Sequence, residues 1–358
     1  MMRLEPRTAP SPLLTYGAPV LAAVISLVLA AIPLLAAGAN VFQAYGVMIS
    51  GALGSQFALT EVVARATPLI LTGLAAAIAF RAKLFNIGAE GQLYIGALAA
   101  VAIGAGRFDG PAPLMILGIC IAGAVAGALM MLGPTVLKVK LGADEVVTTL
   151  LLNFIVALFV QMMIEGPMKD PMSMGWPQSE PILDSATLPK LIDKTRVHAG
   201  LIIAILAAIG TEILMRRTVP GFRIRAVGAS PAAARFAGMS VTKTMLLGGA
   251  LSGAFAGLAG VGEVAGLKGY LTNDLSPGYG YAGIVVAMLA GLSPIGVIAA
   301  AFFVAAVFVG ADSMSRAMTV SSYIANLIVA LGLLSVLLSG VLTRYHIRWS
   351  SPARGRAS

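Results

Sequence analysis

The sequence predicts an all-α fold, a bundle of about ten membrane-spanning helices with both ends of the chain in the cytoplasm. Of the 358 residues, 58% are hydrophobic and 11% are charged, whereas a soluble domain carries about 25% charged residues. Apolar stretches long enough to cross a hydrocarbon core about 30 Å thick recur along the chain. Forty-one glycines suit helices that pack closely without water to drive them together.

About ten candidate spans follow from a scan for stretches of roughly 20 apolar residues. The second and the eighth are short, and each is followed by a polar or Gly/Pro-containing break. We expect the first to be a retained helix, because its apolar run is longer than the core of a signal peptide. In chain order the predicted spans are residues 16–37, 66–80, 88–106, 112–133, 146–165, 198–215, 243–266, 281–293, 295–312 and 322–342.

The basic residues support this topology. With both ends inside, most of the 24 lysines and arginines fall in cytoplasmic segments, as the positive-inside rule requires. The chain is then one transmembrane domain, 1–358, in the inner cell membrane. Its parts outside the bilayer are a cytoplasmic tail at 1–15, a stretch at 38–65 with a short amphipathic or re-entrant helix, an external loop at 166–197, a cytoplasmic segment at 216–242 and a basic cytoplasmic tail at 343–358.

Missing motifs exclude several classes of protein. There is no phosphate-binding loop of the G-x-x-x-x-G-K-[ST] type, so this chain is not expected to hydrolyse ATP. Two histidines and one cysteine make a histidine-based zinc site, a catalytic triad or a cysteine metal site improbable. The basic residues lie in short loops and form no dense patch with interleaved aromatics, so no nucleic-acid partner is expected.

The cytoplasmic segment at 216–242 contains residues typical of the two ends of a short helix. Ser230 suits the N-cap, Pro231 the first helical position, and Gly238 a left-handed position just after the end. Such a helix would carry Arg235 and Phe236. It is suited to dock against another protein, or it is an ordinary connector in the lipid interface. The external loop at 166–197 also has two interpretations: it is a solvated connection, or it is part of a docking surface for an external partner.

Polar residues within the spans are the candidates for chemistry. Asn86, Glu90 and Gln92 stand at the start of the third span, where they either satisfy the broken helix or meet a solute. Asn153 lies about two turns into an apolar helix, where it needs a partner or a water-lined cavity. Capping explains the two carboxylates before it, and interhelical hydrogen bonding is the simpler interpretation of the remaining polar groups, which are Gln161, Glu263, Tyr281 and Asn326.

Four motifs in order resemble one transport family. They are residues 86–92 (NIGAEGQ), 145–153 (EVVTTLLLN), 221–228 (GFRIRAVG) with its continuation to Gly238, and 278–289 (GYGYAGIVVAML). Together they resemble the permeases of the branched-chain amino acid, ribose and nucleoside ATP-binding cassette (ABC) importers, and most of all the longer nucleoside-type, or simple-sugar, permease. The resemblance covers the chain from about residue 60 to 342.

This resemblance implies partners and a coupling site. The partners would be an ABC ATPase subunit, a second homologous permease and an extracytoplasmic substrate-binding protein, with ATP and Mg on the ATPase and no cofactor on this chain. The segment from Gly221 to Gly238 would be the coupling helix that the ATPase moves. Its expected coupling residues are Gly221, Phe222, Arg223, Arg225, Gly228, Arg235 and Gly238.

The resemblance also implies transport by alternating access, driven by ATP binding that favours one conformation. A neutral solute with several hydroxyl groups needs amides, hydroxyls and apolar walls along its path. The expected pathway residues are Asn86, Glu90, Gln92, Thr148, Asn153, Glu263 and Asn326. Three alternatives stay open. The first is a secondary transporter or channel in which Glu90 or Glu263 couples proton movement to transport; the others are a non-transporting membrane scaffold or receptor, and an ABC permease for branched-chain amino acids.

Overall fold

The computed structural model describes residues 2–6, 24–25, 27–108, 110–318 and 320–349. The chain divides into two compact units, one of residues 52–309 and one that joins residues 1–51 to residues 310–358. Each unit is described by itself below. The division concerns compactness alone, and the expectation of one transmembrane domain over 1–358 stays a prediction.

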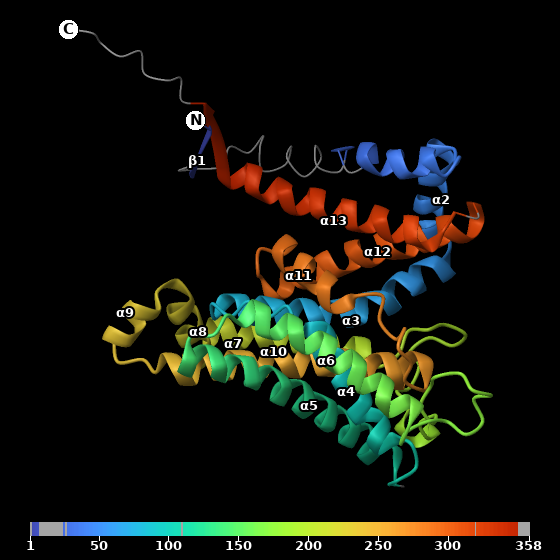
Figure 1. The fold of residues 1–358 in the computed structure, drawn as a ribbon, viewed down its shortest axis with the longest axis horizontal. Helices are drawn as coiled ribbons and strands as arrows, with labels where there is room; N and C mark the ends of the chain where they lie inside the picture. The colour runs from blue at the N-terminus through green and yellow to red at the C-terminus, as the bar shows by residue number, and fades with distance from the viewer. Residues whose placement is uncertain (1, 7–23, 26, 109, 319, 350–358) are drawn as a thin grey trace. The chain divides into compact units, whose positions relative to one another are not determined.

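The larger unit is helical (Figure 1). Its elements in chain order are α3 (Gln56–Arg81), α4 (Ala89–Gly104), α5 (Ala112–Leu141), α6 (Glu145–Glu165), a 3₁₀ turn (Asp184–Ala186), α7 (Gly200–Arg217), α8 (Val219–Ala229), α9 (Pro231–Phe236), α10 (Val241–Glu263), a π-helical turn (Val264–Lys268), α11 (Tyr279–Leu289) and most of α12 (Pro294–Met318).

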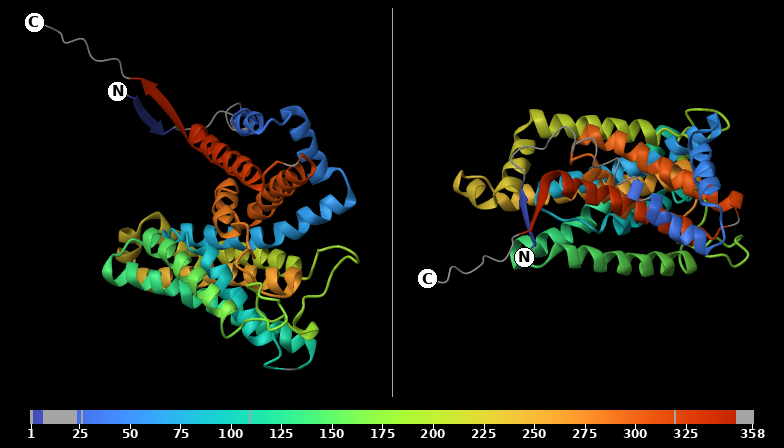
Figure 2. Two further views of the ribbon diagram at one scale, coloured as in Figure 1. Left: turned by 45° about the vertical axis from the view of Figure 1, so that its right-hand side comes forward. Right: turned by 90° about the horizontal axis from the view of Figure 1, so that it is seen from above.

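Helix α10 packs against α3, α4 and α5 (Figure 2), and glycine makes these contacts close. A Cβ atom added to Gly253 or Gly257 would overlap the backbone of α5, and one added to Gly260 would overlap the backbone of α4. Small residues of this kind let helix backbones approach where lipid replaces water as the solvent. The glycine content of the sequence therefore has a structural cause in α10.

Burial separates a central helix from peripheral ones. In the most apolar 18-residue window of α3, 89% of residues are buried, against 28% in those of α5 and α6. The outer faces of α5 and α6 instead expose a series of large apolar side chains, including Leu117, Ile121, Leu129, Ile155 and Leu158. Exposed apolar faces of this extent are expected where lipid is the neighbour.

Five helices of the described residues are long and apolar enough to cross a membrane by length and composition: α3, α5, α6, α10 with its π turn, and α12. A sixth arises if the helix Leu27–Ala36 and α2 (Val41–Leu53), between which the chain bends by 116°, count as one span. Two further apolar helices, α4 and α11, are shorter. The expected number of spans and the cytoplasmic position of both ends stay predictions.

Several boundaries differ from those expected. Helix α3 begins at Gln56, ten residues before the expected start at 66, because the Ser55 hydroxyl caps it by accepting from the Ala58 N–H at 3.0 Å. Helix α5 continues past the expected end at 133 to Leu141, and Gly142 ends it with a φ of +70°. The prediction ended this span at the pair Gly133–Pro134, but the structure accommodates Pro134 inside α5.

The smaller unit contains the helix Leu27–Ala36, α2, the end of α12, α13 (Ser322–Arg344) and two strands. The short helix expected within 38–65 is confirmed as α2. Residues 16–23 of the first expected span lie outside the described residues. Strands β1 (Met2–Pro6) and β2 (Tyr345–Trp349) pair antiparallel, which the purely helical prediction missed, because five-residue segments of alternating character carry little signal on their own.

Candidate solute pathway and coupling surface

Helices α4 and α11 are each shorter than the hydrocarbon core of a bilayer is thick. With 16 and 11 residues at 1.5 Å of rise each, they span about 24 Å and 17 Å, against a core about 30 Å thick. Helix α11 begins inside the bundle, where Tyr279 is 4% exposed. A Cβ atom added to Gly280 would overlap the backbone of Ala89 and Glu90. The first turns of the two short helices therefore touch.

Glu90 joins these two helix starts. Its Oε2 accepts a hydrogen bond of 2.6 Å from the backbone N–H of Gly280. Ser276 Oγ accepts from the N–H groups of Gly278 and Tyr279 at 3.1 and 2.9 Å. The N-terminus of a helix carries partial positive charge, so one carboxylate lies at the positive ends of both α4 and α11. We call the contact between Ala89–Gly91 and Gly278–Tyr281 the half-helix joint.

Asn153 ties a third helix, α6, to the joint. Its Oδ1 accepts from the Gly91 N–H at 2.9 Å, and its Nδ2 donates to the Ile87 carbonyl at 3.0 Å and to the Tyr281 hydroxyl at 3.1 Å. Asn153 is 6% exposed, whereas Tyr281 is 42% exposed. The joint therefore offers one aromatic side chain at its surface, with its hydroxyl already oriented by Asn153.

A second polar cluster lies entirely inside the bundle. Asn86 Nδ2 donates to Gln92 Oε1 at 2.8 Å and to Ser252 Oγ at 2.9 Å, and Gln92 Nε2 donates back to Asn86 Oδ1 at 3.0 Å. Ser252 in turn donates to the Ala75 carbonyl at 2.7 Å. Asn86 and Gln92 are 0% and 1% exposed. This network connects α3, α4 and α10, and its groups satisfy one another.

The remaining expected pathway residues lie in different surroundings. The Thr148 hydroxyl donates to carbonyls of its own helix, while the neighbouring Thr149, which sequence reasoning missed, accepts from the Ile87 N–H at 3.3 Å. Glu263 is 4% exposed at the end of α10, and its Oε1 has no hydrogen-bond partner. Asn326 is an exposed residue of α13 in the other unit.

The two carboxylates before Asn153 have different roles. Asp144 is the N-cap of α6, where its Oδ1 accepts from the Val146 N–H at 2.8 Å. Glu145 instead pairs with Lys138 and accepts from the Phe85 N–H at 3.1 Å. Capping explains Asp144, but Glu145 holds the chain break between α3 and α4 to the ends of α5 and α6.

The expected coupling segment consists of two helices. The N-cap of α9 is Ser230, whose Oγ accepts from the Ala233 N–H at 3.2 Å, and Gly238 follows the helix with a φ of +77°. Both features agree with the sequence pattern. Helix α8, capped by Thr218, lies largely within the segment from Gly221 to Gly238, which the resemblance assigned to one coupling helix, and it has Pro220 in its first turn. Proline is tolerated in a first helical turn.

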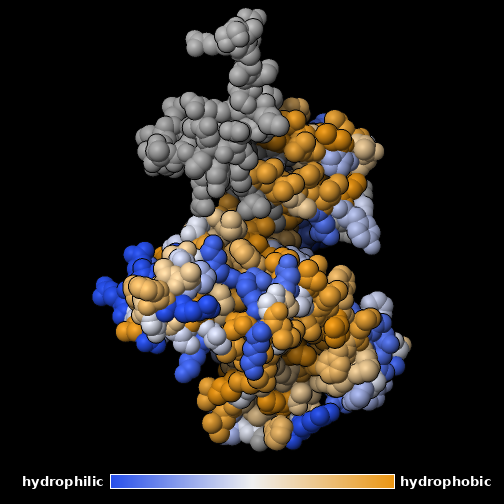
Figure 3. Space-filling view, turned by 60° about the vertical axis from the view of Figure 1, so that its left-hand side comes forward, coloured by the Kyte–Doolittle hydropathy of each residue, from blue (hydrophilic) through white to orange (hydrophobic). Residues whose placement is uncertain are grey.

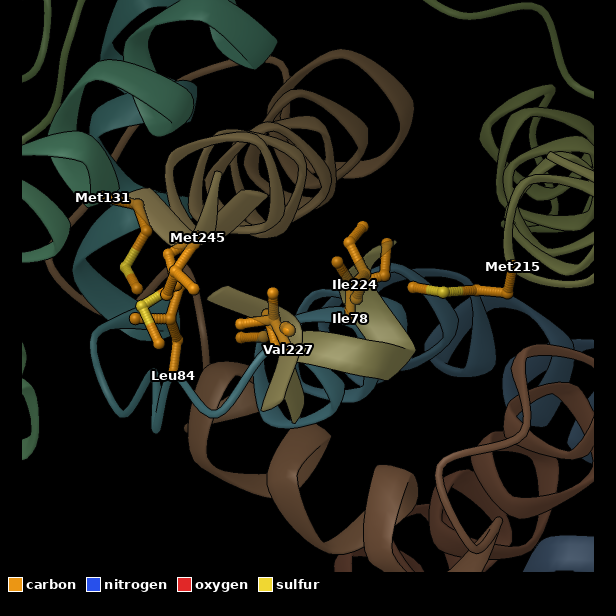
Figure 4. Packing of buried hydrophobic residues seen from close by; sticks show 11 residues of the cluster. Ile78, Leu84, Met131, Met215, Ile224, Val227 and Met245 are labelled. Atoms are coloured by element: carbon orange, nitrogen blue, oxygen red, sulfur yellow. The ribbon is translucent and has the colours of Figure 1, made fainter. Parts of the chain in front are cut away.

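Glycine brings α8 against the bundle. A Cβ atom at Gly221 would overlap the Leu214 carbonyl of α7, and one at Gly228 would overlap the Arg81 carbonyl of α3. Between them, Ile224 and Val227 are fully buried. They belong to one buried cluster (Figure 4), which also includes Ile78 of α3, Met131 of α5, Met215 of α7 and Met245 of α10. Helix α8 is therefore held against α3, α7 and α10.

The opposite side of the two helices is exposed. Phe236 is 97% exposed and Phe222 is 53% exposed. Arg223, Arg225 and Arg235 are also exposed. We call α8 and α9 with these exposed residues the coupling surface. Figure 3 looks onto the end of the larger unit that carries it, where hydrophilic residues lie beside apolar sides of the bundle. Large exposed aromatic residues next to arginine are typical of protein interfaces.

Metal ligands do not gather in the part of the chain that the structure describes, where no group of three His, Cys, Asp or Glu side chains could hold an ion. The joint and the coupling surface thus offer hydrogen bonds, aromatic surface and positive charge. Such groups bind and position other molecules.

Comparison with known proteins agrees with this geometry. The family described as branched-chain amino acid transport system, permease component, matches residues 58–342. The chain is 38% identical to the glucose ABC transporter permease protein of Haloferax volcanii, over 99% of this chain and 95% of the relative. It is 36% identical to the guanosine ABC transporter permease protein of Bacillus subtilis, over 89% of this chain and 92% of the relative.

A third relative is the nucleoside ABC transporter permease protein of Lactococcus lactis subsp. cremoris, with 36% identity over 83% of this chain and 84% of the relative. The matched family region includes both the half-helix joint and the coupling surface. The chain therefore belongs to the family of branched-chain amino acid transport system permease components, and it is a multi-pass membrane permease subunit of an ABC importer.

Proposed function

We propose that this chain translocates nucleosides or related simple sugars across the inner membrane by alternating access, driven by a separate ATPase subunit. The names of three relatives support this class of solute, since they refer to glucose, guanosine and nucleosides. In this proposal the chain crosses the membrane ten times, as the sequence predicts, with both ends in the cytoplasm. It works with a second homologous permease and an extracytoplasmic substrate-binding protein.

The half-helix joint is the observation that carries the choice of a neutral solute. Helix N-termini inside a membrane are natural sites for an anionic group of a solute. Here the N-terminus of α11 is already bonded to the carboxylate of Glu90. An amino acid would bring a second carboxylate to the same place and be repelled. A nucleoside or sugar has no such charge, and it can use the aromatic face of Tyr281 and hydroxyl contacts beside it.

The coupling surface supports the ATP-driven mechanism. Helix α8 is packed against α3, α7 and α10, so force applied to Phe236 and Arg235 would move the bundle and not just a loop. ATP and Mg would be bound by the ATPase, which must contact the coupling surface differently in its two states for ATP binding to shift the conformation. This chain binds no cofactor in the proposed mechanism.

Uptake measurements test the proposal. Cells that carry this chain with its partners would be given labelled guanosine, glucose, ribose or leucine, with wild-type chain or with Arg225→Glu plus Arg235→Glu. Lys140→Glu is the matched control, because Lys140 is an exposed basic residue at the end of α5, outside the coupling surface. We expect guanosine or sugar uptake to be lost in the double variant and retained in the control.

Two results would contradict the proposal. Uptake of leucine alone would overturn the solute class while leaving an ABC permease in place. Uptake by the lone chain that responds to a proton gradient and ignores the charge reversal would overturn coupling to an ATPase. Membrane levels of each variant, measured by immunoblot, separate loss of transport from loss of protein.

A further inference from the structure

We propose that the turn at residues 171–177 in the external loop is the contact point for the substrate-binding protein, and that it fits an apolar recess on that partner. This inference rests on the proposed function, because it assigns a surface to one of the proposed partners. The turn displays three large apolar side chains to solvent: Met172 is 85% exposed, Met174 102% and Trp176 68%. Isolated exposed apolar residues are common, but three within five positions form a patch.

The turn is held in one shape by Asp170, which is itself 9% exposed. Asp170 Oδ1 accepts from the Met172 N–H at 2.8 Å, and its Oδ2 accepts from Gln178 Nε2 at 2.9 Å. Backbone bonds between Asp170 and Gln178 and between Trp176 and Ser173 close the turn at 3.0 and 2.9 Å. The apolar side chains are therefore preorganised, which lowers the entropy lost on binding a partner.

The position of the loop favours a protein over the bilayer. In Figure 1 the loop that follows α6 projects past the ends of α6 and α10, along the helix direction, and not outward from their apolar sides. The loop also has no net charge, since four basic residues balance four acidic ones: Lys169, Lys190, Lys194 and Arg196 against Asp170, Glu180, Asp184 and Asp193. Docking there would depend on apolar contact and little on salt.

The loop is bonded to the chain that leads to the half-helix joint. Ser179 N donates to the Leu271 carbonyl at 2.9 Å, and Leu271 N donates to Ser179 Oγ at 2.8 Å. The chain then runs from Leu271 to Ser276, whose Oγ accepts from the N–H of Tyr279, the first residue of α11. The Tyr94 hydroxyl anchors this segment on α4 by donating to the Asn273 carbonyl at 2.6 Å. A partner seated on the turn is thus connected to the proposed solute site through one short segment.

The test measures binding of the substrate-binding protein of this importer, purified and loaded with the solute that uptake identifies, to the assembled importer in lipid nanodiscs. We expect Met174→Ser plus Trp176→Ser to weaken binding by about tenfold or more, the scale of lost interface anchors. ATP hydrolysis stimulated by the binding protein should fall with it, while hydrolysis in its absence stays unchanged. Both side chains are exposed, so folding should be unaffected.

Leu191→Ser plus Ile192→Ser is the matched control, because these residues are 42% and 46% exposed in a different turn of the same loop, and we expect it to bind normally. Asp170→Ala is a second variant, which keeps the apolar side chains but frees the turn, and it should also weaken binding. Unchanged affinity in the Met174/Trp176 variant, with wild-type stimulation intact, would overturn this inference alone. No response of the wild-type importer to its binding protein would overturn the proposed function, and this inference with it.

Fluorescence distinguishes a protein contact from a lipid contact. The chain has two tryptophans, so Trp349→Phe leaves Trp176 as the single reporter in this subunit. We expect its emission to shift to shorter wavelength when an unlabelled, tryptophan-free variant of the binding protein is added. Quenching of Trp176 by brominated lipids before any partner is added would show that the turn enters the bilayer, which would overturn the proposal.

Discussion

Glu90 Oε2 accepts a hydrogen bond of 2.6 Å from the backbone N–H of Gly280, so a carboxylate in the first turn of α4 caps the first turn of α11. The two residues are 190 positions apart in the sequence. Without it the Gly280 N–H at the start of α11 would be left unpaired inside the bundle, which is costly. The contact lets α11 begin there.

Removing this carboxylate should loosen the joint. We expect Glu90→Ala to lower the free energy of unfolding by about 1–3 kcal/mol, the cost of leaving buried donors without an acceptor. Glu90→Gln should cost less, because its amide oxygen can still accept from Gly280. The midpoint of thermal unfolding of the purified chain in detergent would rank the variants.

Glu165→Ala is the control for the charge removed, since Glu165 ends α6 and is exposed. It should unfold like the wild type. If Glu90→Ala were as stable as the wild type, the contact between Glu90 and Gly280 would have no role in holding α11.

Adding a single methyl group at the joint should separate the two helices. A Cβ atom at Gly280 has no room against the backbone of Glu90, so we expect Gly280→Ala to cost about 1–3 kcal/mol through overpacking. Gly133→Ala adds the same group to α5, where nothing lies within 4 Å. The control should be neutral or slightly stabilising, because alanine favours helix over glycine. Equal midpoints of thermal unfolding for the two variants would show that α4 and α11 can move apart at this contact without loss of stability.

Sequence patterns were sufficient for features that depend on neighbouring residues. The caps of α9, Ser230 and Gly238, and the N-cap of α6, Asp144, follow from the local order of residues. The break after α3 and the short helix α11 are also visible as interrupted apolar runs. These are local effects of backbone geometry and capping.

Contacts between distant segments could not be predicted in the same way. Nothing local distinguishes Thr148 from Thr149, yet Thr149 bonds to the Ile87 N–H while Thr148 bonds to its own helix. Likewise, nothing local shows that Gly221 and Gly228, which were expected as coupling residues, each lie at a helix contact with no room for a side chain. Which face of a helix meets which neighbour is decided by packing across the whole bundle.

Asn86 and Thr148 should behave differently, although both were expected in the solute pathway. Asn86→Ala would leave Gln92 Oε1 and the Gly88 N–H without a partner and would remove one of the two bonds of Ser252, at a cost of about 1–3 kcal/mol for each buried group left unpaired. We therefore expect little folded Asn86→Ala chain in the membrane. Thr148→Ala should be folded at wild-type levels. Size-exclusion profiles of the fluorescently tagged variants provide the measurement, and a normal profile for Asn86→Ala would contradict the structural role of this network.

The contact of α8 with the bundle can be weakened without changing the exposed side chains of the coupling surface. Gly228→Ala forces α8 away from the Arg81 carbonyl, so we expect ATP-driven uptake to fall several-fold while exposed Phe236 and Arg235 still bind the ATPase. Gly210→Ala, on an open face of α7 with nothing within 4 Å, should transport normally. Copurification of the ATPase with each variant, measured beside uptake, separates weakened transmission from lost assembly. Normal uptake by Gly228→Ala would show that α8 need not be tightly packed.

Phe236 should matter for assembly and not for folding. Its side chain is 97% exposed, so Phe236→Ser removes no buried contact and should leave the thermal midpoint of the isolated chain unchanged. If the ring fills a pocket of the ATPase, its loss should weaken association by about 2 kcal/mol or more, roughly thirtyfold in the dissociation constant.

Phe108→Ser is the matched control, because Phe108 is 62% exposed in the turn between α4 and α5, at the other end of the bundle. The dissociation constant for purified ATPase, measured on nanodisc-embedded permease, should rise for Phe236→Ser alone. An unchanged dissociation constant for Phe236→Ser would show that the ATPase does not depend on α9, and the exposed residues of α8 would then be the expected contact.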